Sequence, residues 1–304
     1  MNHRSKRHWA FAAILIVAVF GLLTFTTRSP RAARTTNRLA TNRLASNRLA
    51  TNKLASNKLA SNALSSTRLE ANMATADLLS TDDGRQVYSY LINCALPADV
   101  SIQASVTGAA DTAPPATLYT CSSGLCVFPG GIGLAEYWID HKLDPKGQRW
   151  VSACMFARVN AHDTAEPISL RGPHDALTVS PDEATQFPIQ EGAFYGNLFT
   201  GDNPIDWNAC RGSGQAAGEF DGLVDRDCAE PDPLDPTHTQ CGFKYAGDCV
   251  DYSPALPSPF ACHSYDSDLG IFEDCHDTPG DGHWPGSPPN REVITVYVTC
   301  APDC

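Results

Sequence analysis

The segment EVITVYVT, Glu292–Thr299, is the clearest β-strand in this 304-residue chain. Successive side chains of a strand point to opposite faces, so its residues divide into two rows. One row holds Val293, Thr295, Tyr297 and Thr299, and the other holds Ile294, Val296 and Val298. Two more segments, Gln86–Asn93 (QVYSYLIN) and Asp99–Val106, carry branched and aromatic residues at alternating positions and are also predicted to be strands. We therefore predict a mainly β fold of the β-rich α+β class.

A few short helices are expected between these strands. Ser180-Pro181-Asp182-Glu183 has a capping residue, a proline in the first turn and early acids, which favour a helix start. Asp144-Pro145 opens a second predicted helix that continues through Arg149–Val159. From Asn203 to Asn290, proline and glycine are frequent and apolar runs are short. This pattern predicts a loop-rich C-terminal part that is held together by cysteines.

Charge and cysteine content both change near residue 81. Residues 1–81 hold 12 Lys/Arg and two acids, a net charge of +10, and no cysteine. Residues 82–304 hold the other 10 Lys/Arg and 32 acids, a net charge of −22, with all 12 cysteines. We predict three parts: a signal peptide or membrane anchor over 1–30, a basic pentapeptide-like repeat or spacer over 31–81, and an acidic, cysteine-rich extracytoplasmic domain over 82–304. A subdivision of this domain near 200–210 is compatible with the long gap between its cysteine groups.

The N-terminus carries a charged and then an apolar segment. Arg4, Lys6 and Arg7 precede the apolar run Ala10–Phe25, which is slightly shorter than the roughly 20 residues of a membrane-spanning helix. Two interpretations stay open: an uncleaved anchor that places residues 9–27 in the membrane, and a cleaved signal peptide. Positive charge just after the run opposes export. The cysteines outweigh this objection, because an even number of cysteines is typical of an oxidising compartment.

A five-residue repeat follows, beginning TNRLA at residue 36. Its period fits neither a helix stripe nor one face of a strand. In period and in its Asn and Leu usage it resembles the pentapeptide-repeat family, although Arg or Lys separates the two residues here. We expect a solvated spacer that tethers the domain without folding against it. Its in-register cations would attract anionic lipid headgroups or other anionic envelope polymers; they are Arg38, Arg43, Arg48, Lys53 and Lys58. Nucleic acid is not an expected partner, since the repeat offers no aromatic residue for stacking.

The cysteines are predicted to form disulfides. No C-x2-C pair occurs, so the paired knuckles of zinc ribbons are missing. We expect pairing within 94–154 and within 210–304, and favour Cys121 with Cys126 and Cys241 with Cys249. The full set is Cys94, Cys121, Cys126, Cys154, Cys210, Cys228, Cys241, Cys249, Cys262, Cys275, Cys300 and Cys304.

Acidic residues of the loop-rich part are candidate ligands for a cation. Their spacing is seen in calcium loops, without completing the EF-hand pattern. The candidate Ca²⁺ ligands are Asp221, Asp225, Asp227, Asp266 and Asp268. A solvated acidic surface is the alternative. Zinc held by His263, His276 and His283 with Asp266 and Asp277 is a further interpretation, and Trp138 and Trp284 are candidates for stacking on sugars.

The acidic domain resembles a family of exported, cysteine-rich proteins of myxobacteria that carry an N-terminal Asn-x-Leu repeat. The resemblance rests on QRWVSACMFARVNAH (148–162), PISLRG (167–172), EGAFYGNLF (191–199) and CGFKYAGDC (241–249). It implies export and no particular activity.

Enzyme motifs are absent from the sequence. It has no G-x-S-x-G, no H-E-x-x-H and no phosphate-binding glycine loop, so no catalytic residue is assigned. We expect a membrane-tethered or secreted, disulfide-rich protein of the cell envelope with a binding or structural role. The alternative is a secreted hydrolase that acts on polysaccharide or peptide, through a pair of carboxylates as acid and base.

Overall fold

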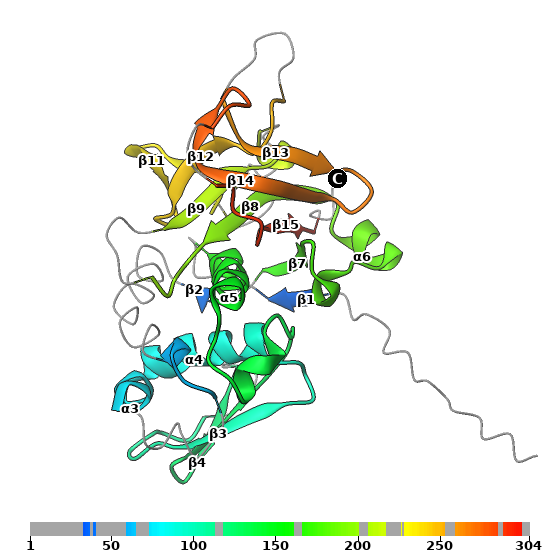
Figure 1. Ribbon diagram of the computed structural model, residues 1–304. Coiled ribbons are helices and arrows are strands. Elements are labelled where there is room, and N and C mark those ends of the chain that lie inside the picture. The colour runs from blue at the N-terminus through cyan, green and yellow to red at the C-terminus, as the bar shows by residue number, and fades with distance from the viewer. Residues whose placement is uncertain are drawn as a thin grey trace, which may run out of the picture.

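A ten-stranded sheet dominates the computed structural model (Figure 1). The structure describes residues 33–36, 39–40, 59–64, 73–112, 118–160, 166–200, 206–216, 226, 228–252, 259–284 and 288–299. The path through the sheet is β1 (Ala33–Thr36), β7 (Pro167–Arg171), β15 (Ile294–Val298), β8 (Ile189–Gly196), β9 (Trp207–Arg211), β12 (Lys244–Asp248), β11 (Asp235–Thr239) and β10 (Pro231–Asp232). Off this path, β13 (Phe260–Asp266) pairs with β12 and with β14 (Ile271–Gly280). The mainly β prediction is confirmed.

The strand predicted from EVITVYVT is confirmed as β15. It lies between β7 and β8 and is antiparallel to both. All five of its residues are buried. Helix α5 (Pro145–Ala157) packs against β15, and on the row that contains Thr295 the backbone N–H of Phe272 in β14 donates to the Thr295 hydroxyl at 2.9 Å, so both rows of side chains lie in the interior.

Two helix starts are also confirmed. The Asp144 carboxylate accepts a hydrogen bond of 2.7 Å from the backbone N–H of Gly147 and caps α5. Ser180 caps α6 (Pro181–Gln186) in the same way, by accepting from the backbone N–H of Glu183 at 3.2 Å. In both helices a proline follows the cap, where its missing N–H costs nothing.

The segment QVYSYLIN is a helix, and the strand prediction for it was wrong. It belongs to α4 (Asp82–Ala95), which Thr81 caps through a 3.0 Å hydrogen bond from the N–H of Gly84. Residues 87–92 are all buried, because α4 contacts α3 (Met73–Leu79), α5 and β5 (Leu125–Pro129). A helix covered on several sides loses its polar face, so the helical period is not visible in the sequence.

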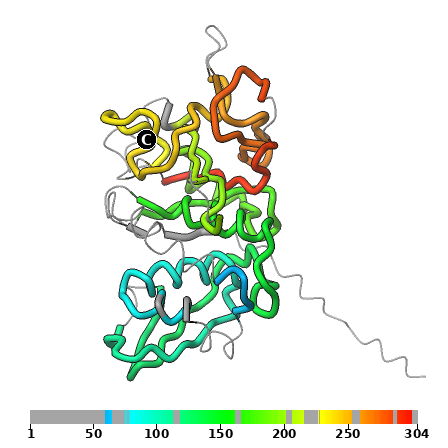
Figure 2. The backbone as a smooth tube through the Cα atoms, turned by 60° about the vertical axis from the view of Figure 1, so that its left-hand side comes forward, coloured from blue at the N-terminus to red at the C-terminus, as the bar shows by residue number. Residues whose placement is uncertain are grey.

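A second layer lies below α5 in Figure 1 and consists of α3, α4 and a three-stranded sheet. That sheet has the order β3 (Ser101–Ser105), β5 and β4 (Thr120–Ser122), and β3 confirms the strand expected over Asp99–Val106. Figure 2 shows the same layering, with this cyan to green part at the lower end. The principal core is continuous from Tyr88 and Phe128 of this layer to Phe194 and Val296 of the large sheet.

The smaller elements complete the described chain. They are the two-stranded parallel pair β2 (Leu39–Ala40) and β6 (Val159–Asn160), the short helix α7 (Ser213–Ala216), and 3₁₀ turns at Glu136–Ile139 and Asp175–Leu177.

Parts of the repeat pack into the fold, which corrects the expected boundary at residue 81. Strand β1 pairs with β7, and β2 pairs with β6. Leu59 and Leu64 are fully buried in the principal core. The backbone of this segment is also bonded: the N–H of Leu64 donates to the carbonyl oxygen of Trp138 at 2.9 Å. The expectation that the repeat only tethers the domain is therefore wrong for residues 33–36, 39–40 and 59–64.

The C-terminal part contains more strand than the sequence suggested. Where the structure describes residues 203–290, it forms the six strands β9 to β14. Where the structure describes the turns between these strands, they contain proline or glycine, as at Pro233, Gly242 and Gly270. None of the helices in the described ranges is long and apolar enough to cross a membrane. The apolar run 10–25 lies outside those ranges.

Five disulfides join the ten cysteines of the described chain. They are Cys94–Cys154, Cys121–Cys126, Cys210–Cys249, Cys228–Cys241 and Cys262–Cys275. All five stay within the two predicted groups, and the Cys121–Cys126 pair is confirmed. The predicted Cys241–Cys249 pair was wrong. Cys241 bonds to Cys228, and Cys249 bonds to Cys210 of β9. Cys300 and Cys304 lie outside the described residues.

Candidate functional site

Strand β14 carries a large bulge opposite β13. Cys275 faces Cys262, and Gly280 faces Phe260, so β14 advances five residues while β13 advances two. Just before this bulge Asp274 has a φ of 52°, a conformation that is uncommon for a residue other than glycine. Bulges release side chains from the ladder and re-aim them, and they are frequent beside functional sites. The bulge of β14 therefore changes the direction of the side chains between Cys275 and Gly280.

The bulge brings Asp277 to the start of β9. There the side-chain nitrogen of Asn208 donates to one oxygen of Asp277 at 3.4 Å and to one oxygen of Asp206 at 3.0 Å. From the other side, the side-chain nitrogen of Asn290 donates to the same oxygen of Asp277 at 3.0 Å. We call Asp206, Asn208, Asp277 and Asn290 the carboxylate–amide cluster.

Burial differs within the carboxylate–amide cluster. Asn208 is only 1% exposed, and its side-chain oxygen has no hydrogen-bond partner. Asp206, Asp277 and Asn290 are half-buried, so solvent reaches them. Among the residues that the structure describes, neither aspartate forms an ion pair. Two carboxylates are thus held beside a buried amide without a cationic side chain in contact.

The electrostatics follow from this arrangement. Burial raises the pKa of Asp206, and the nearby charge of Asp277 raises it further. The hydrogen bond from Asn208 opposes this shift, as do the more distant charges of Lys244 and Arg149. The cluster therefore favours a proton or another positive charge at Asp206.

An aromatic group flanks the bulge. The ring of Trp284 stacks on His276, with centroids 4.2 Å apart and an interplanar angle of 6°. The indole N–H of Trp284 donates to the carbonyl oxygen of Thr278 at 3.1 Å. Phe260 meets the indole edge-on at 5.6 Å, and His263 does so at 6.4 Å. Trp284 thus lies over the residues on either side of Asp277 and is itself half-buried.

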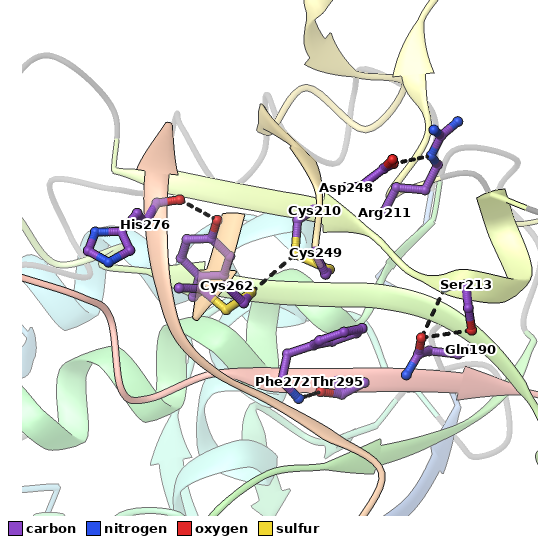
Figure 3. Close-up of a disulfide and its surroundings, with 12 residues drawn as sticks. Gln190, Cys210, Arg211, Ser213, Asp248, Cys249, Cys262, Phe272, His276 and Thr295 are labelled. Atoms are coloured by element: carbon purple, nitrogen blue, oxygen red, sulfur yellow. Dashed lines mark hydrogen bonds and ion pairs between the residues drawn. A yellow bond between two sulfur atoms is a disulfide. The ribbon is translucent and has the colours of Figure 1, made fainter. Parts of the chain in front are cut away.

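His276 has an unusual environment for a histidine. It is 6% exposed, and its buried Nδ1 has no hydrogen-bond partner. Burial lowers its pKa, while the charges of Asp277 and Asp274 act in the opposite direction. Its backbone is fixed, since the buried hydroxyl of Tyr195 donates to its carbonyl oxygen at 2.7 Å. Figure 3 shows its ring directed away from the neighbouring sulfur atoms.

The sequence-predicted calcium ligands fall into two groups. Asp266 and Asp268 lie at the turn between β13 and β14, where Asp266 accepts backbone hydrogen bonds from Asp268 at 2.9 Å and Leu269 at 3.0 Å. These bonds give Asp266 a role in the turn itself. Asp221, Asp225 and Asp227 lie outside the described residues. The calcium hypothesis for all five stays a prediction.

Packing and exposure distinguish among the candidate sugar-stacking tryptophans and zinc-binding histidines. Trp138 is fully buried, and its indole N–H donates to the carbonyl oxygen of Asn62 at 3.0 Å, so it is a core residue. His263 and His276 meet at Trp284, whereas His283 is exposed. Within the described ranges, one group of three potential metal ligands converges, namely Cys210, Cys249 and Cys262. All three are in disulfides, and the Sγ atoms of Cys210 and Cys262 are 3.6 Å apart (Figure 3).

Asp206, Asn208 and Asn290 were not among the sequence-predicted site residues. No motif links them to Asp277, and only the pairing of β9 with its neighbours and the bulge in β14 brings them together.

No protein-family model, no curated protein and no solved structure matches this chain. Half-buried carboxylates and amides can hydrogen-bond polar ligands, hold a cation, or share a proton.

Proposed function

We propose that this protein is an extracytoplasmic protein of the cell envelope, membrane-tethered or secreted, with a binding role. Its ligand is neutral and polyhydroxylated, such as an envelope glycan, and it binds at the carboxylate–amide cluster beside Trp284. The observation that carries the proposal is the convergence of Asp206 and Asp277 on the buried amide of Asn208, together with the stacking of Trp284 on His276, the residue that precedes Asp277. The five disulfides support the compartment, because disulfides are typical of proteins outside the cytosol.

The chemistry of the surface favours a ligand of this class. Carboxylate and amide groups accept and donate hydrogen bonds to hydroxyl groups, and an indole ring offers an apolar surface to the C–H groups of a sugar. The net charge of −22 over residues 82–304 repels polyanions. The opposite charge of the first 81 residues supports contact of the basic repeat with anionic lipid headgroups or envelope polymers.

Binding to an array of glycans and peptidoglycan fragments tests the proposal. We expect the full chain to retain a glycan, and Asp277→Ala to weaken its affinity at least tenfold by removing a carboxylate from the cluster. The matched control is Asp281→Ala, which removes an exposed carboxylate from the same acidic region and should bind as the wild type does. Absence of binding to every glycan, or equal losses in both variants, would refute the proposed ligand class.

A secreted hydrolase is the second candidate, and one observation favours it. The raised pKa of Asp206 beside the second carboxylate of Asp277 is the pattern of an acid and base pair. Release of reducing sugar ends or of peptide fragments would show turnover, and Asp206→Asn and Asp277→Asn should each abolish it. Glycan binding without any product supports the binding role over this alternative.

A further inference from the structure

We propose that the disulfides Cys210–Cys249 and Cys262–Cys275 form one redox-sensitive switch, in which internal thiol–disulfide exchange creates a Cys210–Cys262 bond. The exchange releases β14 from β13 beside the carboxylate–amide cluster and so weakens binding at that site. The effect on binding rests on the proposed function, whereas the exchange itself does not.

The sulfur atoms of the two disulfides are in contact. The Sγ atom of Cys210 lies 3.6 Å from the Sγ atom of Cys262, which belongs to the other disulfide (Figure 3). The Sγ atoms of Cys210, Cys249 and Cys262 all lie within 4.8 Å of one another. The backbone supports this arrangement, because the N–H of Cys262 donates to the carbonyl oxygen of Cys249 at 2.7 Å. Exchange begins when a thiolate attacks a disulfide sulfur, so a thiolate at either contacting position has its target beside it.

The exchange is balanced once a dithiol reductant has supplied two electrons. The reductant is oxidised to its own disulfide, and Cys210–Cys249 becomes two thiols. The Cys210 thiolate then attacks the Sγ atom of Cys262. The Cys210–Cys262 bond forms, the Cys262–Cys275 bond breaks, and Cys275 leaves with the electron pair and takes up the proton that Cys210 lost. If Cys262–Cys275 is reduced first, Cys262 attacks Cys210 and releases Cys249. Both routes give the same product, with thiols at Cys249 and Cys275.

Burial keeps the exchange internal to these four cysteines. All four are 0% exposed and belong to the smaller core. An external thiol reaches them only through local opening, whereas the neighbouring sulfur is already in contact. Burial also disfavours the thiolate, so exchange should be slow at neutral pH and should accelerate as pH rises. Within the described ranges, no third cysteine sulfur joins the other three disulfides in this way.

The Cys262–Cys275 bond fixes β14 next to the carboxylate–amide cluster. Its two residues face each other in the last regular pair before the bulge, and Asp277 follows two positions after Cys275. The exchanged bond joins β13 to β9 instead, so β14 loses its covalent link to β13. Because Asp277 lies on β14 and Asn208 lies on β9, the Asp277 carboxylate then loses its fixed position relative to the Asn208 amide.

Disulfide mapping of variants that lack one cysteine tests the exchange without reductant or glycan. Cys249→Ser leaves a thiol at Cys210, and Cys275→Ser leaves a thiol at Cys262. We expect the Cys210–Cys262 bond in at least about a tenth of the folded chains of both variants, after incubation at about pH 9 to populate the thiolate.

The matched control is Cys241→Ser, which leaves a thiol at Cys228 and should keep it there. Partial reduction of the wild type with limiting dithiothreitol, followed by rapid trapping of thiols, answers the same question without a variant. The species that has lost one disulfide of the smaller core should carry its two thiols at Cys249 and Cys275. Absence of the Cys210–Cys262 bond from this species, or from either folded variant, would overturn the inference.

The effect on the site is measured on two double variants that each lack two cysteines of the smaller core. Cys249→Ser/Cys275→Ser locks the exchanged bond, whereas Cys210→Ser/Cys249→Ser retains Cys262–Cys275. We expect the first variant to show faster amide hydrogen exchange over β14 and at least about tenfold weaker glycan binding than the second. Equal protection of β14, or equal glycan affinity, would overturn the regulatory effect. Pairing and hydrogen exchange are measured without glycan, so their failure is separate from a failure of the glycan array.

Discussion

Replacement of Arg226 by methionine should destabilise the fold severely. Arg226 is fully buried, and its Nε donates to an oxygen of the equally buried Glu191 at 2.5 Å. Its two terminal nitrogens donate to the carbonyl oxygens of Val159 and Ala157, each at 2.7 Å. One guanidinium thus joins β8 to the end of α5 and to β6. Methionine fills much of the same volume but makes none of these bonds.

The expected cost follows from the charge that stays behind. Removal of one partner of a buried ion pair leaves an uncompensated charge and costs about 3–5 kcal/mol. The two carbonyl oxygens lose their donors as well. At about 2–4 °C per kcal/mol for a domain of this size, the melting temperature should fall by roughly 6–20 °C. Both side chains are 0% exposed, so solvent does not compensate the remaining charge.

Thermal and urea unfolding of the variant measure this cost. Arg211→Met is the matched control, because Arg211 pairs with Asp248 at 2.7 Å but its side chain is 29% exposed. That loss should stay on the order of 1 kcal/mol. The double variant Arg226→Met/Glu191→Met should recover part of the stability, since no unpaired charge remains while the carbonyl oxygens of Val159 and Ala157 still lack their donors. A loss below about 1 kcal/mol for Arg226→Met, or no recovery in the double variant, would refute the reasoning.

Three further outcomes are expected. Leu59→Ala should cost about 2–5 kcal/mol, because Leu59 is fully buried in the principal core, whereas Leu125→Ala, at a position that is 46% exposed, should change the urea midpoint little. Thr81→Ala should lower stability by about 0.5–2 kcal/mol through loss of the α4 cap, as measured by urea unfolding. The folded-state pKa of Asp206 is raised above 3.8, so its stabilising contribution is complete below that value and is lost as pH rises through the folded pKa. Asp206→Asn should therefore gain stability relative to the wild type as pH increases from about 4 to 7, and a constant difference would contradict the shift.

The elements that were predicted correctly are those determined by residues close together in the sequence. The β15 strand and the helices capped by Asp144 and Ser180 follow from side-chain type and spacing within a few residues. The error at α4 has a physical cause: its central residues 87–92 are all buried, so alternating bulky residues appeared in place of an amphipathic helical period. The capping signal was nevertheless present, in Thr81 followed by Asp82 and Asp83.

The candidate site depends on contacts that a sequence does not encode in any short window. Asp206 and Asp277 are 71 positions apart, and their approach requires both the position of β9 in the sheet and the extra residues in β14. Cysteine pairing shows the same limit. The short-range bond Cys121–Cys126 joins facing residues of a hairpin, whereas Cys210–Cys249 depends on the parallel pairing of β9 with β12.

The disulfides near the carboxylate–amide cluster stabilise a region whose hydrophobic core is small. They help to keep the cluster residues in position. The smaller core, around β12 to β14, contains ten buried residues, and four of them are Cys210, Cys249, Cys262 and Cys275. Three others are alanines, so apolar burial alone contributes little there. The Cys262–Cys275 bond lies at the last regular pair before the bulge, and the backbone of Asn290 pairs with Cys275 through bonds of 2.7 and 3.0 Å. Covalent and backbone constraints therefore fix the register two residues before Asp277, and this sets where its carboxylate points.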